Sequence, residues 1–399
     1  MLLRRLVRLL VVLSVVAALA VLALWIVSST DFGRERVRRL ALSSLGGATH
    51  GIVKIGAVHG NLLKGAMLVD ISITDSAGRP FLKADSLGGS YVVRGLLSKR
   101  IDIDKLVFYR PRVVVEKLPG GQEWNYRRLW PQSPSTGPVD TLPAWGDWVR
   151  FTNATVIGGD IVVRSPWSPR TGLSGRVRDS VVKDALGDGS RLKIIAVPGG
   201  YQKVIELSKV DATLPLVRIA DPAFENRLIQ VSGLRMVAYP FRPPPAEVRA
   251  MAGNFEFDDD SLWWKGVSAR LPGSNVKGDG MYNIDNGDMR LALAATPAAF
   301  NDFKWLYQRF PKEGGGNLGL SILWKGATQD YVVREADVRS GSAHVRGDVG
   351  VTVADTTVFH GASLRFTGVT TKQIAEVDPS LRSPRDGELS GYARFSGAL

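Results

Sequence analysis

An alternation of apolar and polar residues recurs along most of the chain and constrains its fold more than any other feature. In VDISIT (69–74) every second side chain is apolar, and IDID (101–104) repeats the pattern. A period of two is typical of a β-strand with one buried and one solvated face. Turn-forming residues separate these runs, and no strongly periodic helix intervenes. We therefore expect a mainly β protein in which successive strands are antiparallel neighbours.

The strands expected in the C-terminal half are long and have an apolar side. Residues 342–353 alternate over twelve positions, about 40 Å of extended chain, and 318–324 show the same pattern. Such strands form either an open apolar groove or the core of a closed β-sandwich, and the alternation alone does not choose between them. The candidate groove-lining residues are Leu320, Ile322, Trp324, Val345, Val349, Val351 and Val353.

A weak internal repeat divides this half. Residues 270–279 resemble 339–348 at an offset of 69, and 316–326 resemble 387–397 at an offset of 71. Similar offsets in two independent blocks indicate a β array that grows by addition. Each repeat contains one short helical candidate, 297–309 in the first and 371–378 in the second. Because the chain ends within another alternating run, we expect the natural protein to continue beyond residue 399.

An uncharged run of nineteen residues, 9–27, predicts a transmembrane helix. Its helical length of about 28 Å approaches the roughly 30 Å hydrocarbon core of a bilayer. A secretory signal cut after Ala20 is the alternative, but the run continues unbroken past that point. We therefore expect an uncleaved anchor, with a cytoplasmic tail at 1–8 and the body on the far side of the membrane. Its candidate membrane-contacting residues are Leu9, Leu13, Val16, Leu22 and Trp25.

Composition divides the remaining chain. Residues 31–45 predict an amphipathic helix at the membrane surface, because apolar residues fall near one face and arginines elsewhere. A continuation of the membrane helix into water is the alternative. Residues 48–130 form the first β region. The proline-rich segment 131–145 predicts a linker, and 146–399 is the expected β-repeat groove region.

Catalytic, metal and cofactor signatures are not found. The four histidines have no metal-ligand spacing, there is no cysteine, and no nucleophile or nucleotide-binding motif has the right flanks. The stretch DNGD (285–288) favours a hairpin turn over a calcium site. Of the net charge of +13, +5 lies within residues 1–45 beside the predicted membrane span, and the other basic residues are scattered without the interleaved aromatics of a nucleic-acid surface. We therefore expect neither an enzyme nor a nucleic-acid-binding protein, and no catalytic, metal or cofactor-binding residue is assigned.

Several N-terminal motifs carry a family resemblance. They are HGNLL (59–63), the alternating 69–74, RPFLKADSL (79–87) and LLSKRIDIDKLVFYRPRV (96–113). In this order after a membrane anchor, the chain resembles the AsmA-like superfamily, most of all the N-terminal part of its TamB branch, the inner-membrane subunit of a translocation and assembly module. The resemblance implies a single-pass inner-membrane protein with a periplasmic β-taco, a long antiparallel sheet curled so that its apolar side lines a groove.

Three functions follow as expectations. The resemblance implies a bridge that moves phospholipid between inner and outer membranes, and acyl chains would cover the apolar side at about 0.8 kcal/mol per buried CH₂. It also implies a role in assembling outer-membrane β-barrel proteins or autotransporters, with a TamA-type β-barrel as a possible partner, and sheet edges would be templates for strand addition. A structural stalk with a filled core is the third reading.

Overall fold

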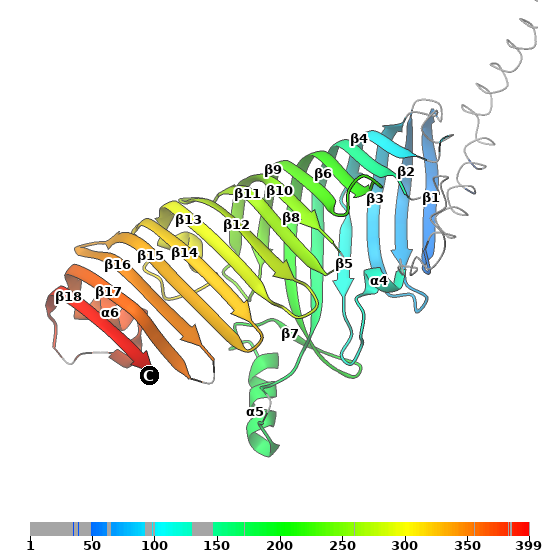
Figure 1. Ribbon diagram of the computed structural model, residues 1–399. Helices are drawn as coiled ribbons and strands as arrows, with labels where there is room; N and C mark the ends of the chain where they lie inside the picture. The colour runs from blue at the N-terminus through cyan, green and yellow to red at the C-terminus, as the bar shows by residue number, and fades with distance from the viewer. Residues whose placement is uncertain are drawn as a thin grey trace, which may run out of the picture.

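The protein is built around one long β-sheet with few helices (Figure 1). The computed structural model describes residues 35, 39, 49–61, 65–91, 98, 100–129, 147–170, 172–258, 260–354, 356–381, 383 and 385–398. The predicted membrane span, nearly all of the predicted surface helix and the proline-rich segment lie outside these residues. Among the helices that are described, none is long and apolar enough to cross a membrane.

The first half of the sheet contains long strands and two short helices. Its strands are β1 (Ile52–Asn61), β2 (Gly65–Thr74), β3 (Pro80–Tyr91), β4 (Ile101–Tyr109), β5 (Arg112–Glu116), β6 (Val149–Trp167), β7 (Ile194–Val197), β8 (Gly200–Ala220) and β9 (Arg227–Tyr239). Its helices are α4 (Asn125–Leu129) and α5 (Gly175–Leu186), neither of which the alternation predicts. Helix α5 escaped prediction because it buries only Ala185 and so has no apolar stripe.

The second half repeats hairpins. Its strands are β10 (Ala246–Phe257), β11 (Ser261–Arg270), β12 (Asn275–Asn283), β13 (Met289–Ala299), β14 (Gly315–Lys325), β15 (Thr328–Ser340), β16 (Ala343–Val353), β17 (Thr357–Thr370) and β18 (Glu388–Ala398). Short helical segments follow β13 and β17: η1 (Phe300–Phe303), then α6 (Thr371–Val377) and η2 (Pro379–Leu381). The two similar sequence blocks thus fall on strands in equivalent places.

The two helical candidates have opposite outcomes. The helix expected at 371–378 is confirmed as α6, which begins with a capping box between Thr370 and Gln373. The helix expected at 297–309 is wrong. Its first residues continue β13, where Ala298 pairs with Gly316 on β14, and only a 3-10 turn follows. Pairing along a long neighbouring strand outweighs the local helical preference.

Most neighbouring strands are antiparallel, as expected, but β6 is an exception. It runs parallel to both β4 and β5, whereas its other partner, β8, is antiparallel. Strand β6 starts beside the start of β4, where Val149 pairs with Ile101. The expectation of antiparallel neighbours throughout is therefore wrong at this crossover.

The DNGD turn is confirmed, with the Gly287 N–H donating to the Asn283 carbonyl (3.0 Å).

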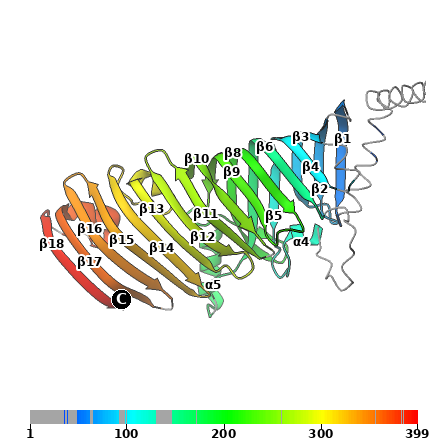
Figure 2. The same ribbon diagram turned by 45° about the horizontal axis from the view of Figure 1, so that its top comes forward.

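The sheet is a single layer (Figure 2). All eighteen strands of the described ranges belong to one sheet, in which each strand is hydrogen-bonded to its neighbours. Fully buried apolar clusters are small: Ile55 with Val58, and Val114 with Val162 and Val204. One continuous sheet, rather than two stacked ones, favours an open apolar face over the closed β-sandwich that the alternation also allows.

Bulges interrupt many strands. Between Trp264 and Val267 on β11, two residues oppose one on β12, and the same irregularity lies between Val333 and Ala336 on β15. On β11 the two bulge residues between Trp264 and Val267 both lie on one side of the sheet. Trp264, Val267 and Ala269 therefore stay together on the other side, which is apolar. An extra residue on one side bends a strand toward the other. Bulges of this kind fall at Asp104–Lys105, Ile157–Gly158, Ser208–Lys209, Ser232–Gly233, Lys265–Gly266, Arg334–Glu335 and His360–Gly361.

Candidate functional site

The candidate site is a continuous apolar face. Directly paired residues on neighbouring strands share a side of a sheet, so the register traces rows of side chains across it. A first apolar row crosses twelve strands without a charge, about 53 Å at 4.8 Å per strand. From β4 to β17 it consists of Ile103, Phe151, Val217, Ile229, Phe255, Trp264, Gly280, Leu291, Ile322, Tyr331, Val351 and Phe359.

A second apolar row runs beside the first on the same side. On β12 the rows are represented by Val276 and Gly280, an even number of residues apart with no irregularity between them. The two rows overlap over most of the sheet and together reach from β1 to β17. The second row consists of Val58, Leu68, Leu87, Phe108, Val156, Ala212, Leu234, Met251, Ala269, Val276, Ala295 and Leu318.

The opposite side has a different chemistry. A row traced in the same way, one residue from the first apolar row, mixes apolar and charged side chains. Arg150 and Asp102 form an ion pair there (2.7 Å), and Asp330 accepts from the Thr352 hydroxyl (2.7 Å). This row consists of Asp102, Arg150, Arg218, Leu228, Glu256, Trp263, Met281, Arg290, Leu323, Asp330 and Thr352.

The structure brings the seven candidate groove-lining residues together on the apolar face. Ile322 and Val351 belong to the first row, and the others lie on the same side of β14 and β16. None is fully buried, and Val353 is 37% exposed. In a closed sandwich, the facing sheet would bury side chains at such positions. The remaining five are Leu320, Trp324, Val345, Val349 and Val353.

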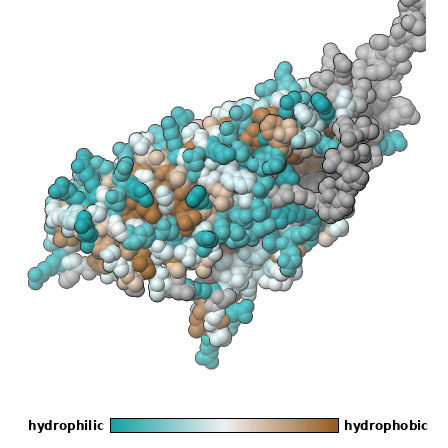
Figure 3. Space-filling view, in the orientation of Figure 1, coloured by the Kyte–Doolittle hydropathy of each residue, from teal (hydrophilic) through white to brown (hydrophobic). Residues whose placement is uncertain are grey.

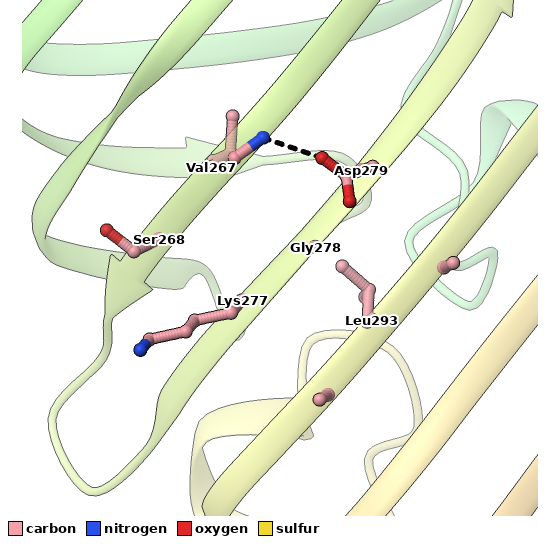
Figure 4. A pocket seen from close by; sticks show the side chains of 9 residues that line it. Val267, Ser268, Lys277, Gly278, Asp279 and Leu293 are labelled. Carbon is pink, nitrogen blue, oxygen red and sulfur yellow. Dashed lines mark hydrogen bonds between the residues drawn. The ribbon is translucent and has the colours of Figure 1, made fainter.

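Hydrophobic surface is visible between hydrophilic margins in the space-filling view (Figure 3). One depression of about 590 Å³ lies over β11, β12 and β13, and most of its lining side chains, including Ser268, Lys277 and Asp279, belong to the charged side of the sheet. There the Leu293 side chain leans toward Gly278 on the neighbouring strand, while Ser268 and Lys277 lie side by side (Figure 4). The depression is shallow and open, as expected where a single layer passes through a small residue.

Trp264 fills the first apolar row where the row has no side chain of its own. A Cβ added to its partner Gly280 would lie 2.2 Å from Trp264 Cζ2, so the indole lies over the glycine. The surface stays apolar across β12 because the ring covers the backbone that glycine exposes.

Aspartates cap three of the bulges. Gly266 N–H donates to Asp279 Oδ1 (2.6 Å), and Glu335 N–H donates to Asp348 Oδ1 (2.7 Å). Gly266 and Glu335 both have a positive φ, +59° and +51°. The offset of 69 that relates the repeats maps Gly266 to Glu335 and Asp279 to Asp348. The aspartate of the repeated Gly-Asp motif therefore has a structural role that sequence reasoning missed. Its carboxylate accepts the N–H of a bulge residue on the charged side of the neighbouring strand.

The third capped bulge is earlier in the sheet. Gly158 N–H donates to Asp211 Oδ1 (2.9 Å), and the Arg235 guanidinium pairs with Asp211 Oδ2 (2.8 Å). The hydrogen bond from Arg235, followed by that from Gly158, lowers the pKa of Asp211. The carboxylate is therefore ionised at neutral pH and satisfies an N–H that the bulge leaves outside the strand pairing.

One long-range contact shows that the sheet curls. Arg127 on α4 pairs with Asp285 in the β12–β13 turn (3.0 Å). Helix α4 is fixed beside β5, because Asn125 bonds the Glu116 N–H and the Val114 carbonyl. Strands β5 and β12 are six positions apart, about 29 Å in a flat sheet. Only curling brings the two within reach.

Among the described residues, no group of three or more His, Asp or Glu side chains could hold a metal ion. His344 pairs with Asp337 and His360 with Asp330, each at 2.7 Å, on the charged side of β15–β17. The hydrogen bond from His344 lowers the pKa of Asp337. Each histidine contacts one carboxylate, as in a cross-strand pair.

The candidate membrane-contacting residues, Leu9 to Trp25, lie outside the described part of the chain. The seven residues predicted to line a groove share one side of the sheet because β14 and β16 alternate without interruption. Comparison with protein-family models, with curated proteins and with solved structures gives no match.

Proposed function

We propose that this protein carries phospholipid along its apolar face, as a membrane-anchored bridge between the inner and outer membranes of a bacterium. The observation that carries the proposal is the pair of apolar rows, which together extend about 67 Å from β1 to β17 without a charged side chain. The bulges support it, because an extra residue on the charged side bends each strand toward the apolar side. The apolar face then lines a trough, the β-taco that the AsmA-like resemblance implies.

Acyl chains suit this face better than a protein core does. An apolar surface larger than a few hundred Å² needs a partner, and the side chains of the first apolar row on β14 to β17 are only half-buried. Burial of acyl CH₂ groups needs no directional bonds and is worth about 0.8 kcal/mol per group. A trough of uniform chemistry therefore lets a lipid slide between equivalent positions.

A single charge on the apolar face tests the proposal. Ile322→Glu, in the middle of the first row, should reduce capture of lipid by photo-crosslinkers at Val345 and Val351 at least tenfold. Leu323→Glu is the matched control, because Leu323 is the next residue, points to the charged side and is 47% exposed. Wild-type protein that captures no lipid from either position would refute the proposal, provided that its circular dichroism shows folded β structure.

A role in outer-membrane protein assembly is the second candidate, and strand β18 favours it. Within the described residues β18 pairs only with β17, so its other edge is open. Leu389, Tyr392 and Phe395 on this strand are between 42% and 57% exposed. An open, apolar edge strand is a template for strand addition. Crosslinks from the β18 backbone to a client protein, rather than to lipid, would support this alternative.

A further inference from the structure

Two cations meet one aromatic ring at a margin of the apolar face. The Lys203 ammonium lies 5.7 Å from the centre of the Phe241 ring, and the Arg191 guanidinium carbon lies 5.2 Å from it. Lys203 is near the start of β8, Arg191 precedes β7, and Phe241 follows β9. One strand and two connections therefore converge on this cluster.

Lys203 belongs to the apolar side of its strand. Ile205 and Leu207 follow it at two-residue intervals with no bulge between them, and they pair with Val163 and Ile161 on β6. Lys203 itself pairs with Ser165 and Ile194. It is thus a positive charge at the end of an apolar strip, and burial lowers its pKa.

No carboxylate of the described residues forms an ion pair with either cation. The nearby acids are engaged elsewhere: Asp188 with Arg242 (2.9 Å), and Glu206 with Lys193 (2.8 Å) on the other side of β8. A half-buried cation without a counter-charge is partly desolvated at a cost, which makes such a position typical of ligand binding.

The cluster is held in place by its surroundings. Trp305 stacks on Phe241 with ring centres 6.4 Å apart, and its carbonyl accepts a hydrogen bond from the Arg191 guanidinium. The Arg242 N–H donates to the Arg191 carbonyl (2.8 Å). The two cations are therefore presented by a fixed aromatic platform rather than by free surface side chains.

We propose that Arg191 and Lys203 bind the phosphate of a phospholipid headgroup at this margin while the acyl chains lie on the adjoining apolar strip. A phosphate suits this cluster because arginine and lysine both bind its oxygens by charge-assisted hydrogen bonds. The strip of Ile205, Leu207 and their β6 partners begins directly beside it, so charge and apolar surface meet as they do in the ligand. This inference rests on the proposed lipid-carrying function and names its headgroup contact.

The test compares two lipids with identical fluorescent acyl chains, phosphatidylglycerol and diacylglycerol, on the purified full chain in detergent. Wild-type protein should bind phosphatidylglycerol more tightly. The double substitution Arg191→Gln and Lys203→Gln should weaken phosphatidylglycerol binding about tenfold and leave diacylglycerol binding unchanged. Arg191→Lys with Lys203→Arg should retain the preference, which separates lost charge from lost fold. Lys277→Gln, an exposed lysine on the charged side, is the matched control.

Each outcome has a distinct meaning. If the double glutamine variant binds phosphatidylglycerol like the wild type, the headgroup site is refuted while the apolar trough stands. If wild-type protein binds neither lipid, the proposed function falls and this inference with it. If millimolar inorganic phosphate displaces phosphatidylglycerol from the wild type, the cluster is a site for free phosphate, and the lipid assignment is overturned.

Discussion

At the scale of single residues, the two repeats place different residues at the same bulge position. The same bulge position is glycine in one repeat, Gly266 at φ +59°, and glutamate in the next, Glu335 at φ +51°. A side chain in this conformation costs about 1–2 kcal/mol. Glu335→Gly should therefore raise the free energy of unfolding by about 1 kcal/mol, and Gly266→Glu should lower it by a similar amount, both measured by urea denaturation. Equal effects of the same sign would contradict the strain assignment.

The capping aspartate of the third bulge should make stability depend on acid. The pKa of Asp211 is lowered, so the folded state favours the ionised form and is stabilised above the ordinary pKa of 3.8. That stabilisation is lost as the pH falls through the lower pKa of the folded state. Asp211→Asn keeps an acceptor for the Gly158 N–H but loses the pair with Arg235. The variant should be less stable than wild type at pH 7 and indistinguishable below the folded-state pKa, in urea titrations at several pH values.

The partner residue supplies the control for this pH dependence. Arg235→Gln removes the same ion pair from the other side, so combining both substitutions should add little to either alone. An undiminished difference between wild type and Asp211→Asn at low pH would show that the aspartate acts through packing rather than through its charge.

At the scale of elements, the sequence predicts what alternation can specify. Strands such as β16 follow from a period of two, and the side that Val349 and Val351 share follows with them. Much of the N-terminal part of the apolar rows did not follow. Phe151 and Val156 are an odd number of residues apart, yet both lie on the apolar face, because the chain inserts an extra outward residue between them. A strand with such an insertion no longer alternates with a period of two along its sequence. Two successive polar or small residues mark the position of the bulge.

Register also decides what sequence pattern leaves open. No local signal pairs Trp264 with Gly280, although this pairing keeps the first apolar row continuous across β12. Gly280→Ala should therefore displace the indole and lower the free energy of unfolding by about 1–3 kcal/mol, the usual cost of overpacking. Gly233→Ala is the control, because nothing lies within 4 Å of its added Cβ. A neutral Gly280→Ala in urea denaturation would mean that the ring does not rest on the glycine.

At the scale of the whole molecule, a single-layer sheet is stabilised mainly by the contacts between neighbouring strands. Strong contacts join adjacent strands, and the pair of Arg127 with Asp285 is one of few that link distant parts of the described chain. Partly exposed ion pairs contribute about 0–1 kcal/mol, so this link closes the curl only weakly. The protein should therefore behave like a repeat array, in which each strand pair stabilises the next and distant parts unfold separately.

Removal of the last four strands tests this behaviour directly. A chain that ends at Lys325 lacks β15–β18 but keeps every strand pairing of β1–β14. Hydrogen exchange should show amide protection in β6–β12 within a factor of a few of the full chain, while β14, now an edge strand, loses protection. The amide of Val217 on β8 should stay protected, because its partners on β6 and β9 remain. Collapse of protection throughout the sheet would instead reveal cooperativity that neighbour contacts alone do not supply.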